Sequence, residues 1–191
     1  MVRLEGENLE RFMSGAFRSS EVERATQKTE MDVGTLSPNS GGKVLRAITA
    51  CRLGAPLESV SRFLDWREFE RFCAGLLLAR GFAVTENITL TRPRMQIDIL
   101  ARSASYALAV DCKHWAQGKG RSALLSAAEA QVARAKRLRK TMEHLEPLAV
   151  VILVLSDEEA RFAEGSAVVP VRTLGSFVDN IESFSQLLVF Y

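Results

Sequence analysis

The sequence of 191 residues predicts an α/β fold in which a central mixed β-sheet is flanked by helices on both faces. Three observations support this prediction. From residue 65 onward, stretches with helical spacing of apolar residues are interleaved with short stretches typical of strands. Residues 148–155 (LAVVILVL) are almost wholly apolar, as expected of a strand covered on both faces. The alanine-rich stretch 122–143 has the length and composition of a long helix.

Residues 1–60 are expected to form a small helical extension, followed by the α/β domain over 61–191. Apolar residues spaced three to four apart predict one helix within residues 1–20 and another over 43–53. Between them, the segment from about 19 to 43 is polar and ends with proline and glycines. That composition predicts a flexible linker.

The α/β domain begins with a helix that starts near Glu58 or Asp65. Asp65 and Glu68 have the spacing of a capping box, an apolar stripe starts at Trp66, and Gly81 ends the helix. The loosely alternating segment 82–90 then predicts the first strand.

The stretch 95–113 predicts two more strands, joined by a turn around residues 103–105. Strand side chains alternate between faces, so Asp111 and Lys113 share one face. If the strands pair as a hairpin, Asp98 on the first meets Asp111 on the second. Two carboxylates beside an amine suit a hard metal cation and the cleavage of a phosphodiester.

The remaining segments complete the predicted sheet and its cover. A glycine-containing loop precedes the long helix, and the apolar strand 148–155 follows it. We expect a short helix over 158–163, a brief strand over 168–171 and a last helix from Ser176 to Phe184, ahead of an apolar tail.

The order of elements and the positions of the acids resemble the PD-(D/E)xK nuclease superfamily, which has the restriction-endonuclease-like fold. Asp98 matches the first acid of that superfamily, and Asp111-Cys112-Lys113 matches its (D/E)xK motif. The similarity is closest to the Mrr-type restriction endonucleases and the archaeal Holliday-junction resolvases, because 110–115 (VDCKHW) is similar to the strand end of Mrr-like proteins. The resemblance covers about residues 65–175.

Two further positions match these branches. Glu70 corresponds to an acid in the first helix, and Gln131 to a glutamine in the helix after the lysine strand. The chain departs from the pattern where 91–96 (TRPRMQ) replaces a glycine-rich segment, and where the proline of the superfamily name is not adjacent to Asp98. The subfamily and its substrate therefore stay open.

The resemblance implies a catalytic set of Glu70, Asp98, Asp111, Lys113 and Gln131. Asp98 and Asp111, with the backbone carbonyl of Cys112, would hold one or two Mg²⁺ or Mn²⁺ ions, and Glu70 is a further candidate ligand. Lys113 would orient the attacking water or stabilise negative charge. The alternatives are two solvated aspartates, a solvent-facing Lys113, an ion pair of Glu70 with Arg67 or Arg71, and a solvated Gln131.

The distribution of charge favours a nucleic-acid partner, although the net charge is only +2. From Lys113 to Lys140 there are eight basic residues and one acid, Glu129. Such groups bind phosphates with salt-sensitive affinity. The alternative is a solvated helix face. The candidate contacts with nucleic acid are Arg92, Arg94, His114, Lys119, Arg121, Arg134 and Arg137.

Together these features predict a Mg²⁺-dependent DNA endonuclease that acts as a homodimer. A non-catalytic nucleic-acid-binding or scaffolding protein of the same fold and an RNA-processing nuclease are the alternatives. Three cysteines without metal-like spacing, no apolar run long enough to span a bilayer and a charged N-terminus predict a cytoplasmic protein without membrane partners.

Overall fold

A computed structural model describes residues 4–17, 20–33, 42–115, 121–142, 144–155 and 161–191, without the side chains of 30–33 and 121. The chain divides into two compact units, Met1–Arg80 and Gly81–Tyr191. The expected boundary between a helical extension and the nuclease domain after residue 60 stays a prediction.

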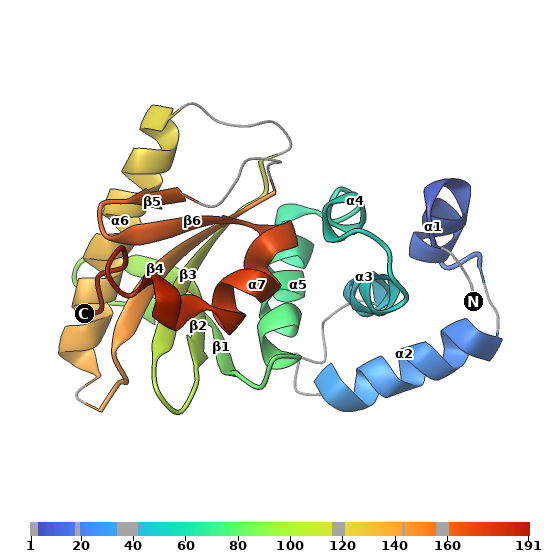
Figure 1. Ribbon diagram of the computed structural model, residues 1–191, viewed down its shortest axis with the longest axis horizontal. Helices are drawn as coiled ribbons and strands as arrows, with labels where there is room; N and C mark the ends of the chain where they lie inside the picture. Colours follow the sequence, from blue (N-terminus) through green and yellow to red (C-terminus); the bar gives the residue numbers. More distant parts are fainter. Residues whose placement is uncertain (1–3, 18–19, 34–41, 116–120, 143, 156–160) are drawn as a thin grey trace. The chain divides into compact units, whose positions relative to one another are not determined.

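The first unit is helical in its described part (Figure 1). Helix α3 contacts the other four helices, and apolar side chains on these helices form the core. Phe12, Ile48, Phe69 and Phe72 are among the buried residues. The helices are α1 (Gly6–Met13), α2 (Ser20–Val33), α3 (Gly42–Arg52), α4 (Leu57–Ser61) and α5 (Trp66–Leu78).

Helix α2 corrects the prediction of a flexible linker over residues 19–43. Residues 20–33 are helical, whereas 34–41 lie outside the described residues. Val22 and Thr29, two turns apart, are both buried, and the Thr29 hydroxyl donates to the carbonyl of Ala25. Packing of this one face against the unit stabilises a helix whose polar composition alone predicts a loop.

The predicted start of α5 is confirmed. The Asp65 side chain accepts a hydrogen bond from the Glu68 backbone, and the Glu68 side chain accepts one from the Asp65 backbone, both at 2.8 Å. The prediction that Trp66 begins the apolar stripe is wrong, because Trp66 is 57% exposed. It occupies the first helical position and faces solvent under the guanidinium of Arg67, and the buried stripe begins at Phe69.

The second unit contains a mixed six-stranded sheet in the order β1-β2-β3-β4-β6-β5 (Figure 1). The first three strands form an antiparallel meander, β3, β4 and β6 are parallel, and β5 pairs antiparallel at the edge. The predicted hairpin between β2 and β3 is confirmed. The strands are β1 (Ala83–Leu90), β2 (Met95–Arg102), β3 (Ala107–Lys113), β4 (Leu148–Val154), β5 (Arg161–Ala163) and β6 (Ser166–Pro170).

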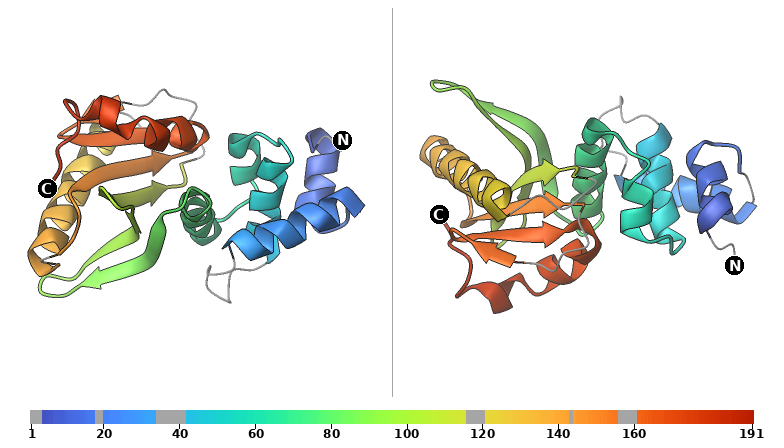
Figure 2. Two further views of the ribbon diagram at one scale, coloured as in Figure 1. Left: turned by 60° about the horizontal axis from the view of Figure 1, so that its bottom comes forward. Right: turned by 90° about the horizontal axis from the view of Figure 1, so that it is seen from above.

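Helix α6 (Arg121–Thr141) makes the crossover between β3 and β4. Figure 2 shows α6 and α7 (Leu174–Asp179) on opposite sides of the sheet. All seven residues of β4 are buried, which confirms that this strand is covered on both faces. The core beneath α6 includes Leu138 of the helix together with residues of β2, β3 and β4.

The predicted order of elements is wrong near the C-terminus. Residues 161–163, expected to be helical, form β5, and 156–160 lie outside the described residues. Phe162 pairs with Ala167 of β6, so backbone pairing at the sheet edge outweighs the local helical pattern. The expected helix from Ser176 to Phe184 is α7, which begins at Leu174, followed by a separate 3₁₀ turn over Ile181–Phe184; another 3₁₀ turn, Val171–Thr173, precedes α7.

Leu138→Ala should destabilise the second unit strongly. Leu138 is 1% exposed in the core between α6 and the sheet. Truncation of a buried leucine leaves a cavity and costs about 2–5 kcal/mol of the free energy of unfolding. Urea unfolding followed by circular dichroism measures this loss. Lys140→Ala on the exposed side of α6 is the control and should change stability by no more than about 0.5 kcal/mol. Equal losses in the two variants would contradict this account of the core.

Candidate active site

The site is built around Asp111, near the end of β3. Asp111 is only 3% exposed, so it is not the solvated aspartate that the alternative interpretation expects. The ammonium nitrogen Nζ of Lys113, two residues along the strand, lies 2.7 Å from Asp111 Oδ2. The alternation of a β-strand places these two side chains on one face, as the sequence predicts.

Helix α6 supplies Arg134 to the same carboxylate and Gln131 to Arg134. Arg134 Nη1 donates to Asp111 Oδ1 at 2.9 Å and to Gln131 Oε1 at 3.0 Å. Gln131 is fully buried, so the alternative of a solvated glutamine is wrong. Residues three apart lie on one face of a helix, which is why Gln131 can hold the guanidinium of Arg134 where it meets Asp111.

Asp98 lies on β2, the neighbour of β3. Ile99 pairs with Val110, and continuation of this antiparallel register places Asp98 opposite Asp111. Asp98 Oδ2 accepts a hydrogen bond from the backbone N–H of Cys112 at 2.8 Å. Asp98, Asp111, Lys113, Gln131 and Arg134 are together called the Asp98–Asp111 site below.

The electrostatics of this site act most clearly on the pKa of Asp98. Burial raises the pKa of Asp98 above its ordinary value, and the nearby charge of Asp111 raises it further. The hydrogen bond from Cys112 and the charges of Lys113 and Arg134 act in the opposite direction but do not cancel the rise. A raised pKa of this kind is expected where two carboxyl groups share a partly buried site.

Two buried polar atoms of the site have no hydrogen-bond partner among the described residues: the acceptor Asp111 Oδ2 and the donor Gln131 Nε2. The contact of Lys113 with Asp111 Oδ2 has the distance of an ion pair but leaves this oxygen without a hydrogen bond. A buried oxygen of this kind, near a second carboxylate, suits a hard divalent cation. Among the described residues no three Asp, Glu, His or Cys side chains cluster, so such an ion would need the Cys112 carbonyl and waters as further ligands.

The predicted nucleic-acid contacts are only partly brought together. The turn Thr91–Arg94 joins β1 to β2 and therefore lies at the same end of the sheet as the end of β3. Arg137 of α6 donates to the backbone carbonyl of Arg92 at 3.1 Å, which brings this turn to α6, and Arg94 is exposed on it. His114 is half-buried directly after Lys113.

Three predicted residues cannot be placed at this site. Lys119 and the side chain of Arg121 lie outside the described residues. Glu70 is half-buried in α5, in the first unit, and its assignment as a ligand stays a prediction. Arg134, predicted to bind nucleic acid, instead contacts the central carboxylate in this structure. Arg134 lies one turn after Gln131 on a helix expected to cover the sheet. This spacing is the sequence signal that indicates an inward position for Arg134.

The family comparison covers the same region as the site. Residues 61–161, just over half of the chain, match the family model of the Mrr catalytic domain, described as a restriction endonuclease. The chain belongs to the Mrr-type restriction endonuclease family. The family match confirms the resemblance of this Mrr-type chain to the PD-(D/E)xK superfamily. Together with the order of the strands, it also confirms the fold class expected from the sequence. Comparisons with curated proteins and with solved structures give no match.

Membership of the family indicates a nuclease, and nucleases with restriction-endonuclease-like domains usually depend on divalent metals. The described part of this Mrr-type chain contains no helix of sufficient length and apolar character to cross a membrane.

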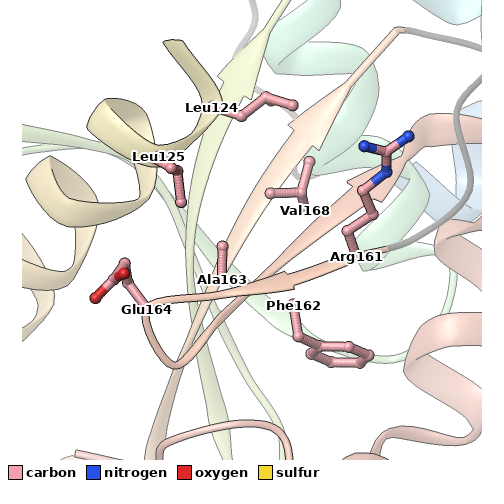
Figure 3. Close-up of a pocket in the computed structure, with 7 residues that line it drawn as sticks. All are labelled: Leu124, Leu125, Arg161, Phe162, Ala163, Glu164 and Val168. Atoms are coloured by element: carbon pink, nitrogen blue, oxygen red, sulfur yellow. The ribbon is translucent and has the colours of Figure 1, made fainter. Parts of the chain in front are cut away.

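A cleft of this Mrr-type chain, separate from the Asp98–Asp111 site, lies between α6 and the β5–β6 hairpin. Figure 3 shows Leu124 and Leu125 extending from α6 toward this hairpin. The cleft has a volume of about 500 Å³ and shares no residue with the Asp98–Asp111 site. Beside it, Trp115 and Leu124 pack against the buried cluster of Ile152, Val154 and Val168. The lining consists of Leu124, Leu125, Arg161, Phe162, Ala163, Glu164 and Val168.

Asp98→Asn should change how stability depends on pH. The folded-state pKa of Asp98 lies above the ordinary value of 3.8, so its contribution to stability is complete below that value and is lost as pH rises through the folded-state pKa. An asparagine does not titrate. The free energy of unfolding of Asp98→Asn, relative to wild type, should therefore increase as pH rises from 3.8 through the folded-state pKa of Asp98.

Urea unfolding across this pH range, with a chelator present to remove metal ions, measures the difference. Asp179→Asn is the matched control because Asp179 is exposed on α7. A stability difference between Asp98→Asn and wild type that is constant or decreases over this range would contradict the assignment.

Proposed function

We propose that this chain is a Mg²⁺-dependent DNA endonuclease. The observation that carries the proposal is the meeting of two carboxylates from adjacent strands with the ammonium of Lys113, where a buried oxygen of Asp111 lacks a hydrogen bond. This is the set of charges that hydrolysis of a phosphodiester needs: oxygen ligands for a hard cation and a positive group for the phosphate.

Each residue has a proposed role. Asp98 and Asp111, with the Cys112 carbonyl, would hold the ion, and Glu70 is a further candidate ligand. When bound, Mg²⁺ supplies Lewis-acid stabilisation of charge on the phosphate oxygens and lowers the pKa of water. Lys113 orients the attacking water and offsets the negative charge that develops.

The proposed reaction is an in-line displacement at phosphorus. The water oxygen forms a bond to phosphorus as the bond to the 3′ oxygen breaks, and a proton passes from the water to that oxygen. The products are a 3′ hydroxyl and a 5′ phosphate.

DNA would approach the end of the sheet at which β3 terminates. Arg94 and Arg92 on the turn between β1 and β2 lie at this end, and Arg137 joins the turn to α6. Guanidinium groups in such positions attract phosphates without regard to base sequence. Cleavage of both strands needs two active sites, so we propose that two copies of the chain act as a homodimer.

Cleavage of supercoiled plasmid tests the catalytic proposal. With Mg²⁺ or Mn²⁺ the wild-type protein should nick plasmid, and chelation should abolish nicking. Asp98→Ala, Asp111→Ala and Lys113→Met should each lower the rate about 100-fold or more, because each removes a ligand or charge that the reaction needs. Asp179→Ala, at an exposed aspartate of α7, is the control and should nick at the wild-type rate.

Two results would contradict this proposal. Binding of plasmid without cleavage in either metal would favour a non-catalytic nucleic-acid-binding protein. Cleavage of RNA but not of duplex or branched DNA would favour an RNA-processing nuclease.

Arg94→Ala should weaken DNA binding and reduce its dependence on salt. Loss of one phosphate contact lowers the slope of log affinity against log salt by about 1. Fluorescence anisotropy with duplex DNA, in calcium to prevent cleavage, measures both quantities. Arg102→Ala is the matched control, because Arg102 pairs with Glu146 at the opposite end of β2. Equal effects of the two substitutions would contradict the proposed path of DNA.

A further inference from the structure

The two oxygens of the Asp111 carboxylate contact different cations. Oδ1 accepts the hydrogen bond from Arg134 at 2.9 Å, and Oδ2 lies 2.7 Å from the ammonium of Lys113. A cation that binds between Asp98 and Asp111 therefore competes with these two positive groups for the carboxylate. The number of metal ions that the site can hold depends on which of the two groups, Arg134 or Lys113, gives up its contact.

Arg134 is the more firmly held of the two. Its Nη1 also donates to Gln131 Oε1, and Gln131 is fully buried on the same helix. The planar guanidinium is thus fixed by two acceptors, and its charge is permanent. Lys113 reaches Oδ2 through a flexible chain, and its contact leaves that oxygen without a hydrogen bond. The oxygen available to a metal ion is therefore Oδ2.

The balance of charge leads to the same conclusion. Asp98 and Asp111 can carry two negative charges, and Lys113 and Arg134 supply two positive charges beside them. One divalent ion can be accommodated if the Lys113 ammonium moves from Oδ2 to the phosphate. A second divalent ion would need Oδ1 as well, and it would lie against the guanidinium of Arg134.

We propose that the Asp98–Asp111 site binds a single divalent cation, through Asp98 and Asp111 Oδ2, and that Arg134 takes the place of a second metal ion. This proposal rests on the proposed metal dependence and resolves whether one or two ions are held. Arg134 is a positioning residue: it holds Asp111 by Oδ1, and Gln131 holds Arg134. Removal of the guanidinium frees Oδ1 and admits a second ion.

Titration with Mn²⁺ alone, in the absence of DNA, tests the proposal by calorimetry and electron paramagnetic resonance. Wild-type protein should bind one ion at the site, defined as the binding that Asp98→Asn abolishes, and give the six-line spectrum of an isolated Mn²⁺. Arg134→Met should bind two ions with the spectrum of a coupled pair, since bridged ions lie about 4 Å apart. Its first ion should bind about tenfold more tightly, because one neighbouring positive charge is gone.

Two variants serve as controls. Arg134→Lys keeps a positive charge beside Oδ1 and should bind one ion. Arg137→Met makes the same change of charge one turn further along α6, where the guanidinium contacts the Arg92 carbonyl, and should also bind one ion.

Two ions at the wild-type site, both lost in Asp98→Asn, would overturn the proposal even if Arg134→Met failed to fold. A single ion bound with unchanged affinity by folded Arg134→Met would overturn it as well. Failure of the proposed function has a different signature, because the wild-type protein would then bind one Mn²⁺ without nicking plasmid.

Discussion

A buried carboxylate, that of Asp111, is the constraint on which the site in the second unit depends. An ionised carboxylate that is removed from water is stable only when cations and hydrogen-bond donors replace the water. Lys113 provides one replacement from the same strand, and Arg134 provides the other from α6. The position of α6 over the sheet is therefore coupled to the chemistry of the site. A shift of the helix by one turn would leave Asp111 with one cation and Arg134 with no carboxylate partner.

The register of β2 against β3 is the second condition. Side chains alternate between faces, so a slip of one residue would turn Asp98 to the other side of the sheet from Asp111. The pairing of Ile99 with Val110 and the apolar residues around it fix the register. The hydrogen bond from the Cys112 backbone to Asp98 adds a polar contact at the same place. Core packing and placement of the acids are thus determined by one set of contacts.

The basic residues of α6 make different contacts, although they form one run in the sequence. Arg134 points to the central carboxylate, whereas Arg137 binds a backbone carbonyl of the turn before β2. Lys136 lies over the ring of Tyr191, near the C-terminus. The run is therefore not a uniform solvated face. Part of its charge holds the site together, and another part holds the turn between β1 and β2 against α6.

Short-range periodicity was enough to predict the α/β class, the hairpin of β2 and β3, the buried strand β4 and the location of Asp111 and Lys113 on one face. It could not show that Gln131 is buried or that Arg134 contacts Asp111, since helix rotation over a sheet depends on the whole core. Residues 161–163 have a helical pattern, and pairing with β6 made them a strand. The polar segment 20–33 became a helix because Val22 and Thr29 pack inward. In each of these cases packing or strand pairing with residues distant in sequence outweighs the local preference of a short segment.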